Sequence, residues 1–342
     1  MRRKGSYWLS VLLAGLIGAG VLGGAKPAAA EQFKFMADWV VYSKHLGFLV
    51  AKEKGWYREK GLDVTIVRGY GSGNTATAIA SGAALIGFTD PANVVLSRDK
   101  GLSLRFLASV HDRGFHTNLA LKSSGIRTAK DLEGKSLGVT FGDAIHTTFE
   151  IFSNAAGLKK WKWVNMAPTA KNPSLLAKKV DAIITFVTVV PQLQMQAAKS
   201  GDSIVSIPWS DYGVRLSSDG ITTTDSVIAQ KPKVADDFVK QSLRGLAYAI
   251  ENPQEGLDIL AKVMPDADRK LNERTWEITL DHTLTPDVKK NGLGYINPDN
   301  MKYHRDVVTK AYGLKKSIPV EDLYTDRFLP SPPLKPTPKP LS

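Results

Sequence analysis

The feature that most constrains this chain is an alternation of strand-like and helical segments that occurs twice along the sequence. Strand-like runs at residues 33–37, 62–67, 84–88 and 104–108 are separated by helical stretches, the first of which, residues 44–54, has apolar side chains at helical spacing. Strands separated by helices of about ten residues are typical of right-handed βαβ units around a parallel sheet. We therefore predict an α/β fold.

The same alternation restarts at residue 137. Strand-like runs at residues 137–139, 163–166 and 182–186 again enclose helical segments. Both 84–88 and 182–186 are followed by a loop and a proline. This repetition predicts two similar α/β lobes, each with a parallel-type sheet flanked by helices.

Two extended, hydroxyl-rich segments set the domain boundaries that we expect. Residues 116–122 and 221–229 are predicted to be antiparallel crossovers between the lobes. The chain after Lys233 is mostly helical, whereas residues 330–342 are rich in proline and should form an extended tail that carries no core. The expected division is residues 31–118 and 221–329 for the first lobe and residues 119–220 for the second.

The first thirty residues have the pattern of a secretory signal. Basic residues at positions 2–4 precede an apolar stretch, and three alanines at positions 28–30 stand before Glu31. We expect cleavage after Ala30 and export to the periplasm; an uncleaved membrane anchor is the alternative. Without this segment, 41 basic and 33 acidic side chains remain, a net charge of +8 with no basic stripe. No nucleic-acid partner is therefore expected.

The 342 residues include no cysteine, which excludes disulfides, thiolate metal sites, iron–sulfur clusters and cysteine nucleophiles. The sequence has no G-x-S-x-G elbow and no H-E-x-x-H motif. Its glycine-rich stretches lack residues that a P-loop or a dinucleotide fingerprint requires. We expect no cofactor, no metal and no catalytic residue.

A first group of candidate binding residues follows the first strand. Asp38 and Trp39 come directly after it, and Tyr42 and His45 lead into the next helix. In open α/β sheets, ligands bind outside the carboxyl ends of strands. Trp39 and Tyr42 offer aromatic faces with polar tips, and the Asp38 carboxylate offers acceptors for amino or amidine groups. Helix capping by Asp38 and simple packing of Trp39 are the structural alternatives.

A second group of candidates lies at the carboxyl ends of later strands in both lobes. Glycine turns before helices leave backbone N–H groups for an anionic or carbonyl group, whereas an aspartate there can instead cap the helix. Aromatic residues at strand ends either close over a ligand or belong to the core. These candidates are Ser72, Gly73, Asn74 and Asp90 in the first lobe, and Phe141, Gly142, Asp143, Phe186, Thr188 and Trp209 later in the chain.

Two longer segments resemble a known family. Residues 53–64, EKGWYREKGLDV, and residues 131–139, DLEGKSLGV, resemble the nitrate/sulfonate/taurine group of ABC-transporter substrate-binding proteins. The resemblance covers about residues 33–329. It implies a type II periplasmic binding protein fold, in which a two-stranded hinge joins two lobes that close on a small-molecule solute. It further implies a monomer that delivers its solute to an ABC permease and is not an enzyme.

Within that group, Asp38 and Trp39, with His45 six residues after the tryptophan, are similar to the branch that binds pyrimidine precursors of thiamine. They are also similar to the fungal thiamine-pyrimidine synthase, but that enzyme uses a cysteine cluster, and a histidine where this chain has residues 90–93. We therefore expect a protein that binds an aromatic or heteroaromatic, thiamine-pyrimidine-like solute. An oxyanion, an alkanesulfonate, an aromatic carboxylate or riboflavin is the alternative solute, and a synthase or a sensor protein is the alternative function.

Overall fold

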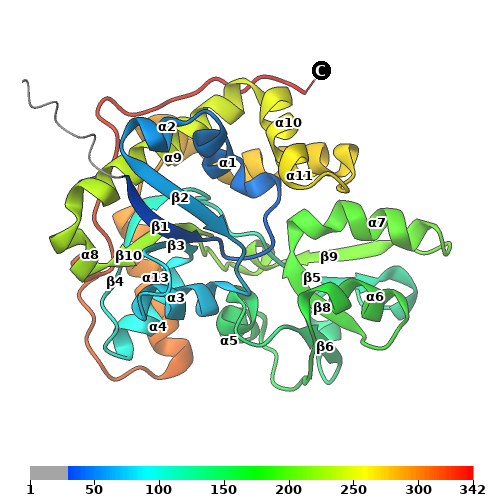
Figure 1. The fold of residues 1–342 in the computed structure, drawn as a ribbon. Coiled ribbons are helices and arrows are strands. Elements are labelled where there is room, and N and C mark those ends of the chain that lie inside the picture. Colours follow the sequence, from blue (N-terminus) through cyan, green and yellow to red (C-terminus); the bar gives the residue numbers. More distant parts are fainter. Residues whose placement is uncertain (1–29, 342) are drawn as a thin grey trace, which may run out of the picture.

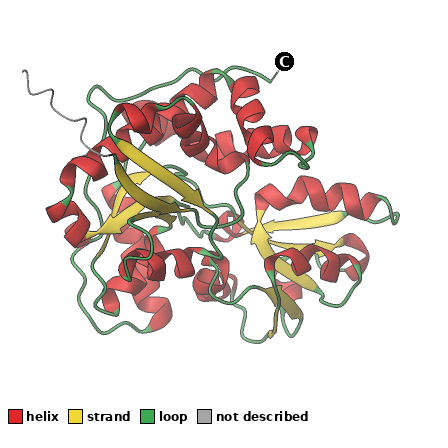
Figure 2. Cartoon of the chain, in the orientation of Figure 1, coloured by secondary structure: helices red, strands yellow, loops and turns green. Residues whose placement is uncertain are grey.

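The computed structural model describes residues 30–341, so the expected signal segment, residues 1–29, lies outside the described part of the chain. The described residues form two five-stranded sheets flanked by helices, which Figure 2 shows as two separate groups of strands. The first sheet has the strand order β2-β1-β3-β10-β4, and the second has the order β7-β6-β8-β5-β9. The predicted two-lobed α/β fold is confirmed.

The strands that the sequence predicts form the frame of both sheets, and one further strand, β9, completes the second. The first lobe contains β1 (Glu31–Met36), β2 (Leu62–Val67), β3 (Ile86–Thr89), β4 (Leu104–Ser109) and β10 (Gly220–Thr224). The second lobe contains β5 (His116–Leu121), β6 (Ser136–Val139), β7 (Lys162–Asn165), β8 (Ala182–Phe186) and β9 (Ile204–Pro208).

The helices surround these sheets, and most of the C-terminal ones cover the first lobe (Figure 1). The first lobe carries α1 (Leu46–Glu53), α2 (Trp56–Glu59), α3 (Ser72–Ala80), α4 (Pro91–Asp99), α8 (Asp225–Gln230), α9 (Pro232–Glu251), α10 (Pro253–Val263), α11 (Arg269–Thr283), α12 (Pro286–Asn291) and α13 (Pro298–Tyr312). The second lobe carries α5 (Ala144–Ala156), α6 (Lys171–Leu176) and α7 (Val190–Ala198).

Neither sheet is purely parallel, which corrects the prediction of parallel-type sheets. β1 pairs in parallel with β2 and β3, and β6 pairs in parallel with β7 and β8. However, β10 is antiparallel to both of its neighbours, and so is β5. The antiparallel strand enters each sheet after the chain has crossed from the other lobe, so it does not follow the βαβ pattern.

The two segments predicted as the hinge are these antiparallel strands, and this prediction was wrong in position. Residues 116–121 form β5, and residues 220–224 form β10. The chain passes between the lobes just before each strand, through residues 110–115, the first crossing, and residues 209–219, the second crossing. The crossings are hydrogen-bonded to each other, since the backbone N–H of Gly114 donates to Leu216 and that of His111 to Asp219. These hydroxyl-rich segments form strands because their side chains can be buried within a sheet. The connections between the lobes have a different sequence and lie just before them.

A shared hydrophobic cluster joins the lobes along one side. It combines Ile79 of α3 and Val95 of α4 with Ile145 and Phe149 of α5, and it continues to Val308 of α13. Helix α5 belongs to the second lobe by sequence, but its apolar face packs against the first. Both N-caps predicted beside this region are present: Asp90 accepts the backbone N–H of Asn93, and Asp143 accepts that of His146.

The proline-rich tail, residues 330–341 of the described chain, is extended as predicted, but it is not free of the core. Leu334 and Leu341 pack against the main hydrophobic cluster of the first lobe, and the backbone N–H of Leu293 donates to the carbonyl of Leu334 at 2.8 Å. Figure 1 shows the tail passing over α9 and α10. In residues 30–341, no helix has both the length and the apolar character needed to cross a bilayer.

Candidate functional site

A buried ion cluster lies where the first strand meets the crossings. The Lys44 ammonium donates to Asp38 Oδ2 at 2.6 Å and to Asp219 Oδ2 at 2.9 Å. The other Asp38 oxygen lies 2.8 Å from Nε2 of His45. Because His45 Nδ1 accepts the backbone N–H of Tyr42, Nε2 carries the hydrogen and donates it to Asp38. Lys44 is 1% exposed and each of the two carboxylates 2% exposed, so solvent does not reach this cluster.

The charged groups of this cluster stabilise one another in their ionised forms. Burial alone would raise the pKa of the Asp38 carboxyl, but the Lys44 ammonium and the His45 hydrogen bond outweigh it and lower that pKa to about 2. Burial likewise opposes the charge on Lys44, but Asp219 and Asp38 raise the pKa of its ammonium well above the ordinary value. Asp90 has no cation of its own, and burial, with the Asp219 carboxylate, raises its pKa to about 6.

The ion cluster ties the loop after β1 to both crossings. Asp219 belongs to the second crossing, and its Oδ1 accepts the Ser72 hydroxyl at the start of α3. His111 of the first crossing lies with Nε2 3.2 Å from the carbonyl oxygen of Lys44. Movement of the crossings relative to the first lobe would therefore displace the loop that carries Trp39 and Tyr42.

On one side of the interface, the lobes meet in a tight seam between the start of α3 and the loop before α5. A Cβ placed on Gly73 would lie 2.9 Å from the carbonyl oxygen of Gly142 in the opposite lobe. The Asn93 amide reaches Thr147 of α5 at 3.4 Å, and the Tyr312 hydroxyl donates to the Thr147 carbonyl. The Gly142 carbonyl thus lies against the first turn of α3, where the sequence predicts an anion or carbonyl site.

On the other side of the interface, a groove of about 640 Å³ opens between the lobes. The loop after β1 and helix α11 line it from the first lobe, and α6, α7 and the end of β8 line it from the second. Its lining side chains include Trp39, Tyr42, Leu271, Asn272, Lys171, Thr185, Phe186, Thr188, Gln192 and Gln196.

Aromatic rings and one buried cation shape the deep part of this groove. The Trp39 and Phe186 rings, one from each lobe, lie 6.5 Å apart and nearly perpendicular. The Lys171 ammonium lies 5.3 Å from the centre of the Trp39 ring and 3.3 Å from an oxygen of Asp143. The Tyr42 hydroxyl and the Thr188 hydroxyl, again from opposite lobes, are 3.3 Å apart. The groove therefore offers flat apolar faces with a few polar groups.

The structure distributes the candidate residues from the sequence over four places. The groove contains Trp39, Tyr42, Phe186 and Thr188, and the seam contains Gly73, Asn74, Gly142 and Asp143. The buried ion cluster and the helix starts next to it contain Asp38, His45, Ser72 and Asp90. In the second lobe, Trp209 is packed on Phe152, and the exposed Phe141 ring stacks on His146. The Asp38 carboxylate, expected to face the solute, has both oxygens engaged by Lys44 and His45.

The sequence analysis did not single out four side chains that the fold brings to these sites. Lys44 and Asp219 complete the ion cluster, and Lys171 lies over Trp39. Gln196 lines the groove, and its buried side-chain oxygen has no hydrogen-bond partner in the described part of the chain. Lysines scattered along helical segments carry no signal of burial. Within residues 30–341, no three histidine or acidic side chains are arranged to hold a metal ion.

The amino-acid sequence is similar to those of known solute-binding proteins. The family model described as NMT1/THI5 like matches residues 42–256. The chain is 24% identical to the riboflavin-binding protein RibY of Chloroflexus aurantiacus, over 88% of this chain and 86% of that protein. It is 25% identical to the formylaminopyrimidine-binding protein of Halalkalibacterium halodurans, over 77% and 80% of the two chains.

A solved structure shows the same fold. The alkanesulfonate-binding protein SsuA of Xanthomonas axonopodis pv. citri, bound to MOPS, superimposes with a TM-score of 0.68 at 15% identity, over 88% of this chain and all of that one. This structural similarity confirms the periplasmic binding protein fold, and the family model with the relatives named for riboflavin and formylaminopyrimidine confirms the resemblance stated from the sequence. Relatives also include proteins named as thiamine-pyrimidine phosphate synthases.

Proposed function

Because this chain belongs to the NMT1/THI5-like family, we propose that it is the periplasmic solute-binding component of an ABC importer and that its solute is a flat heteroaromatic molecule. The groove between the lobes carries the proposal. Trp39 and Phe186 reach it from opposite lobes, so one ring-shaped solute can contact both and hold them together. Aromatic rings prefer offset or edge-to-face contacts with such a solute.

The charges around the groove favour a neutral or amino-bearing solute over an anion. Of the charged side chains that line the groove, Lys171 is already paired with Asp143, and the other two, Asp266 and Asp268, are acidic and exposed. The Gln196 amide lines the groove, and an amide can both accept from and donate to the edge of a nitrogen heterocycle. A sulfonate or nitrate would meet no unpaired cation among these lining residues, and the Gly142 carbonyl lies at the helix start that could have received it.

The names of two relatives support the same class of solute. Riboflavin and formylaminopyrimidine, named for the proteins of Chloroflexus aurantiacus and Halalkalibacterium halodurans, both contain flat nitrogen heterocycles. The alkanesulfonate named for the solved neighbour is the alternative solute. Titration calorimetry with riboflavin, a 4-aminopyrimidine, benzoate and MOPS compares these classes directly.

The Trp39→Ala variant tests whether the groove binds the solute. An aromatic contact is worth about 0.5–1.5 kcal/mol beyond the area that it buries, so we expect the affinity for the heterocycle to fall roughly tenfold or more. Trp163→Ala is the matched control, because Trp163 is also half-buried but does not line the groove. Tight binding of MOPS that survives Trp39→Ala would contradict the heteroaromatic proposal.

An enzyme of the thiamine-pyrimidine synthase type is the rival function, since relatives carry that name. The chain lacks the cysteines of the fungal enzyme, and we propose binding without turnover. Incubation with the heterocycle should give one bound equivalent and no product by mass spectrometry. Product in excess of the protein would establish the enzyme instead.

Delivery to a permease, and not signalling to a sensor kinase, is the remaining part of the proposal. A permease and ATPase pair encoded beside its gene is expected, and the loaded protein should stimulate ATP hydrolysis by that pair when it is reconstituted in vesicles. The protein without solute is the control. No stimulation with the loaded protein would favour the sensor function.

A further inference from the structure

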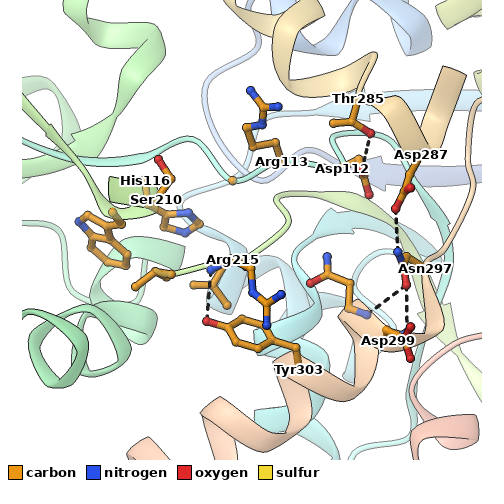
Figure 3. A pocket seen from close by; sticks show the side chains of 15 residues that line it. Asp112, Arg113, His116, Ser210, Arg215, Thr285, Asp287, Asn297, Asp299 and Tyr303 are labelled. Carbon is orange, nitrogen blue, oxygen red and sulfur yellow. Dashed lines mark hydrogen bonds between the residues drawn. The ribbon is translucent and has the colours of Figure 1, made fainter. Parts of the chain in front are cut away.

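A second cavity, of about 400 Å³, lies at the hinge and shares no lining residue with the groove (Figure 3). Both crossings contribute to it, through Arg113 and Gly114 of the first and Val214 to Leu216 of the second. The starts of α12 and α13, from the first lobe, complete its wall. A molecule bound in this hinge cavity would contact both connections between the lobes at once.

Each crossing supplies one arginine to the hinge cavity. No salt bridge of Arg113 or Arg215 is found among residues 30–341, although the Arg113 charge partly offsets the burial that raises the pKa of the Asp112 carboxyl. Arg215 lies over the Tyr303 ring, 4.9 Å from its centre, which keeps the guanidinium at the cavity wall. Guanidinium groups are strong, forked donors to carboxylates, so this side of the cavity suits a carboxylate.

The opposite wall is acidic. Figure 3 shows Asp112 and Asp287 together on the side of the cavity away from His116, and Asp299 of α13 is a third carboxylate in the lining. Asp112 Oδ2 accepts the Thr285 hydroxyl, and Asp287 Oδ2 accepts the Asn297 amide at 2.7 Å. The other oxygen of each carboxylate has no protein partner among the described residues, so both remain acceptors for an ammonium group.

The floor of the cavity contains buried polar atoms that no protein group satisfies. His116 is 6% exposed and Trp209 is 1% exposed, and their rings stack at 4.9 Å. Among the described residues, His116 Nε2 and Trp209 Nε1 have no hydrogen-bond partner. Buried polar groups in folded proteins are almost always paired, and burial lowers the pKa of His116 to about 4, so the ring is neutral.

We propose that the hinge cavity binds a small zwitterion, of the size of an amino acid, with its carboxylate at Arg113 and Arg215 and its ammonium group at Asp112 and Asp287. The cavity has guanidinium groups on one side and carboxylates on another, and this separation of opposite charges favours a zwitterion. A simple anion would be attracted by the arginines but repelled by the aspartates. A simple cation would be attracted by the aspartates but repelled by the arginines. The proposal does not depend on the identity of the solute in the groove.

The test titrates the purified protein with glycine, L-alanine and γ-aminobutyrate, and with acetate and methylammonium as the two halves of a zwitterion. We expect saturable heat from at least one zwitterion and at least tenfold weaker binding of either half. Arg215→Gln and Asp287→Asn should each weaken zwitterion binding by about tenfold, the loss of one charge-assisted hydrogen bond. Both residues are accessible at the cavity wall, and the thermal unfolding midpoint confirms that each variant is folded.

The groove variant Trp39→Ala is the matched control, because it should weaken the heterocycle and leave the zwitterion unchanged. No heat from any of the three zwitterions at millimolar concentration would overturn the proposal. So would zwitterion binding that neither Arg215→Gln nor Asp287→Asn changes, or binding of acetate that equals that of glycine. Loss of zwitterion binding in Trp39→Ala would place the site in the groove and would also overturn it.

Discussion

The two sides of the lobe interface differ in how closely the lobes approach each other. At the seam, backbone meets backbone, since Gly73 has room for no side chain against Gly142, and a continuous apolar cluster runs from α3 and α4 into α5. At the groove, side chains from the two lobes leave about 640 Å³ between them. The seam is therefore suited to set how closely the lobes approach, and the groove to select what is held when they do.

This difference separates changes that act on closure from changes that act on recognition. A seam variant alters the fraction of closed protein and so weakens all solutes equally. A groove variant alters contacts with one solute and leaves closure intact. The buried ion cluster lies beneath both sides and should influence the stability of the whole lobe.

The largest effect is expected for Lys44→Met. It removes the one cation between Asp38 and Asp219 and leaves two buried carboxylates without a counter-charge, which should lower the free energy of unfolding by about 3–5 kcal/mol. Denaturant unfolding measures this loss. The control is Lys302→Met, whose ion pair with Asp306 is on the surface and should contribute almost nothing. A Lys44→Met protein as stable as the parent would show that the cluster is not held by its charges.

The seam is tested next by Gly73→Ala. The added methyl group would overlap the Gly142 carbonyl, and overpacking of this kind costs about 1–3 kcal/mol, which would reduce the closed population roughly 5- to 150-fold. Small-angle scattering with saturating solute should show a larger radius of gyration than for the parent. Gly256→Ala is the control, because its methyl group would make only ordinary contacts at 3.5 Å. Unchanged scattering would mean that the seam does not limit closure.

Asp90, at the base of the seam, predicts a pH dependence. Its pKa is raised from 3.8 to about 6 in the folded protein, so the folded state holds the proton more tightly than the unfolded state. The free energy of unfolding should therefore fall as the pH rises through this interval. Asp90→Asn keeps a capping side chain but removes the charge, and should gain on the order of 2 kcal/mol relative to the parent between pH 4 and pH 7.

The same series distinguishes Asp90 from Asp38. The pKa of Asp38 is lowered to about 2, so its contribution is present above pH 4 and is lost as the pH falls towards 2. Unfolding curves from pH 2 to pH 8 report both intervals. A stability difference between Asp90→Asn and the parent that stays constant with pH would refute the raised pKa of Asp90.

The smallest effect is expected for Tyr42→Phe, which removes the one hydroxyl of Tyr42 that faces Thr188 across the groove. A hydrogen bond of this kind contributes about 0.5–1.5 kcal/mol, so solute affinity should fall by about two- to tenfold. Tyr57→Phe is the matched control, because the Tyr57 hydroxyl lies 2.8 Å from Ser242 within the first lobe. It should lower stability without changing affinity. Equal affinity losses in both variants would show that the Tyr42 hydroxyl has no specific role between the lobes.

Local patterns in the sequence determined much of the frame. The spacing of apolar residues predicted β2 and β8 at their observed bounds, and Asp90 and Asp143 were recognised as possible N-caps. Residues 53–64 and 131–139 indicated the family. These features depend on neighbours within a few positions, so they can be seen in the sequence itself.

Only the tertiary structure decided what several of the candidate residues do. Asp38 was expected to accept a hydrogen bond from the solute, but Lys44, six residues later, and Asp219, far along the chain, draw it into a buried ion cluster. Lys171 came to lie over Trp39, and β5 and β10 took interior places, next to an edge strand, in sheets that the βαβ pattern described as parallel. Burial and charge pairing arise between segments distant in sequence, and no local pattern records which of them will meet.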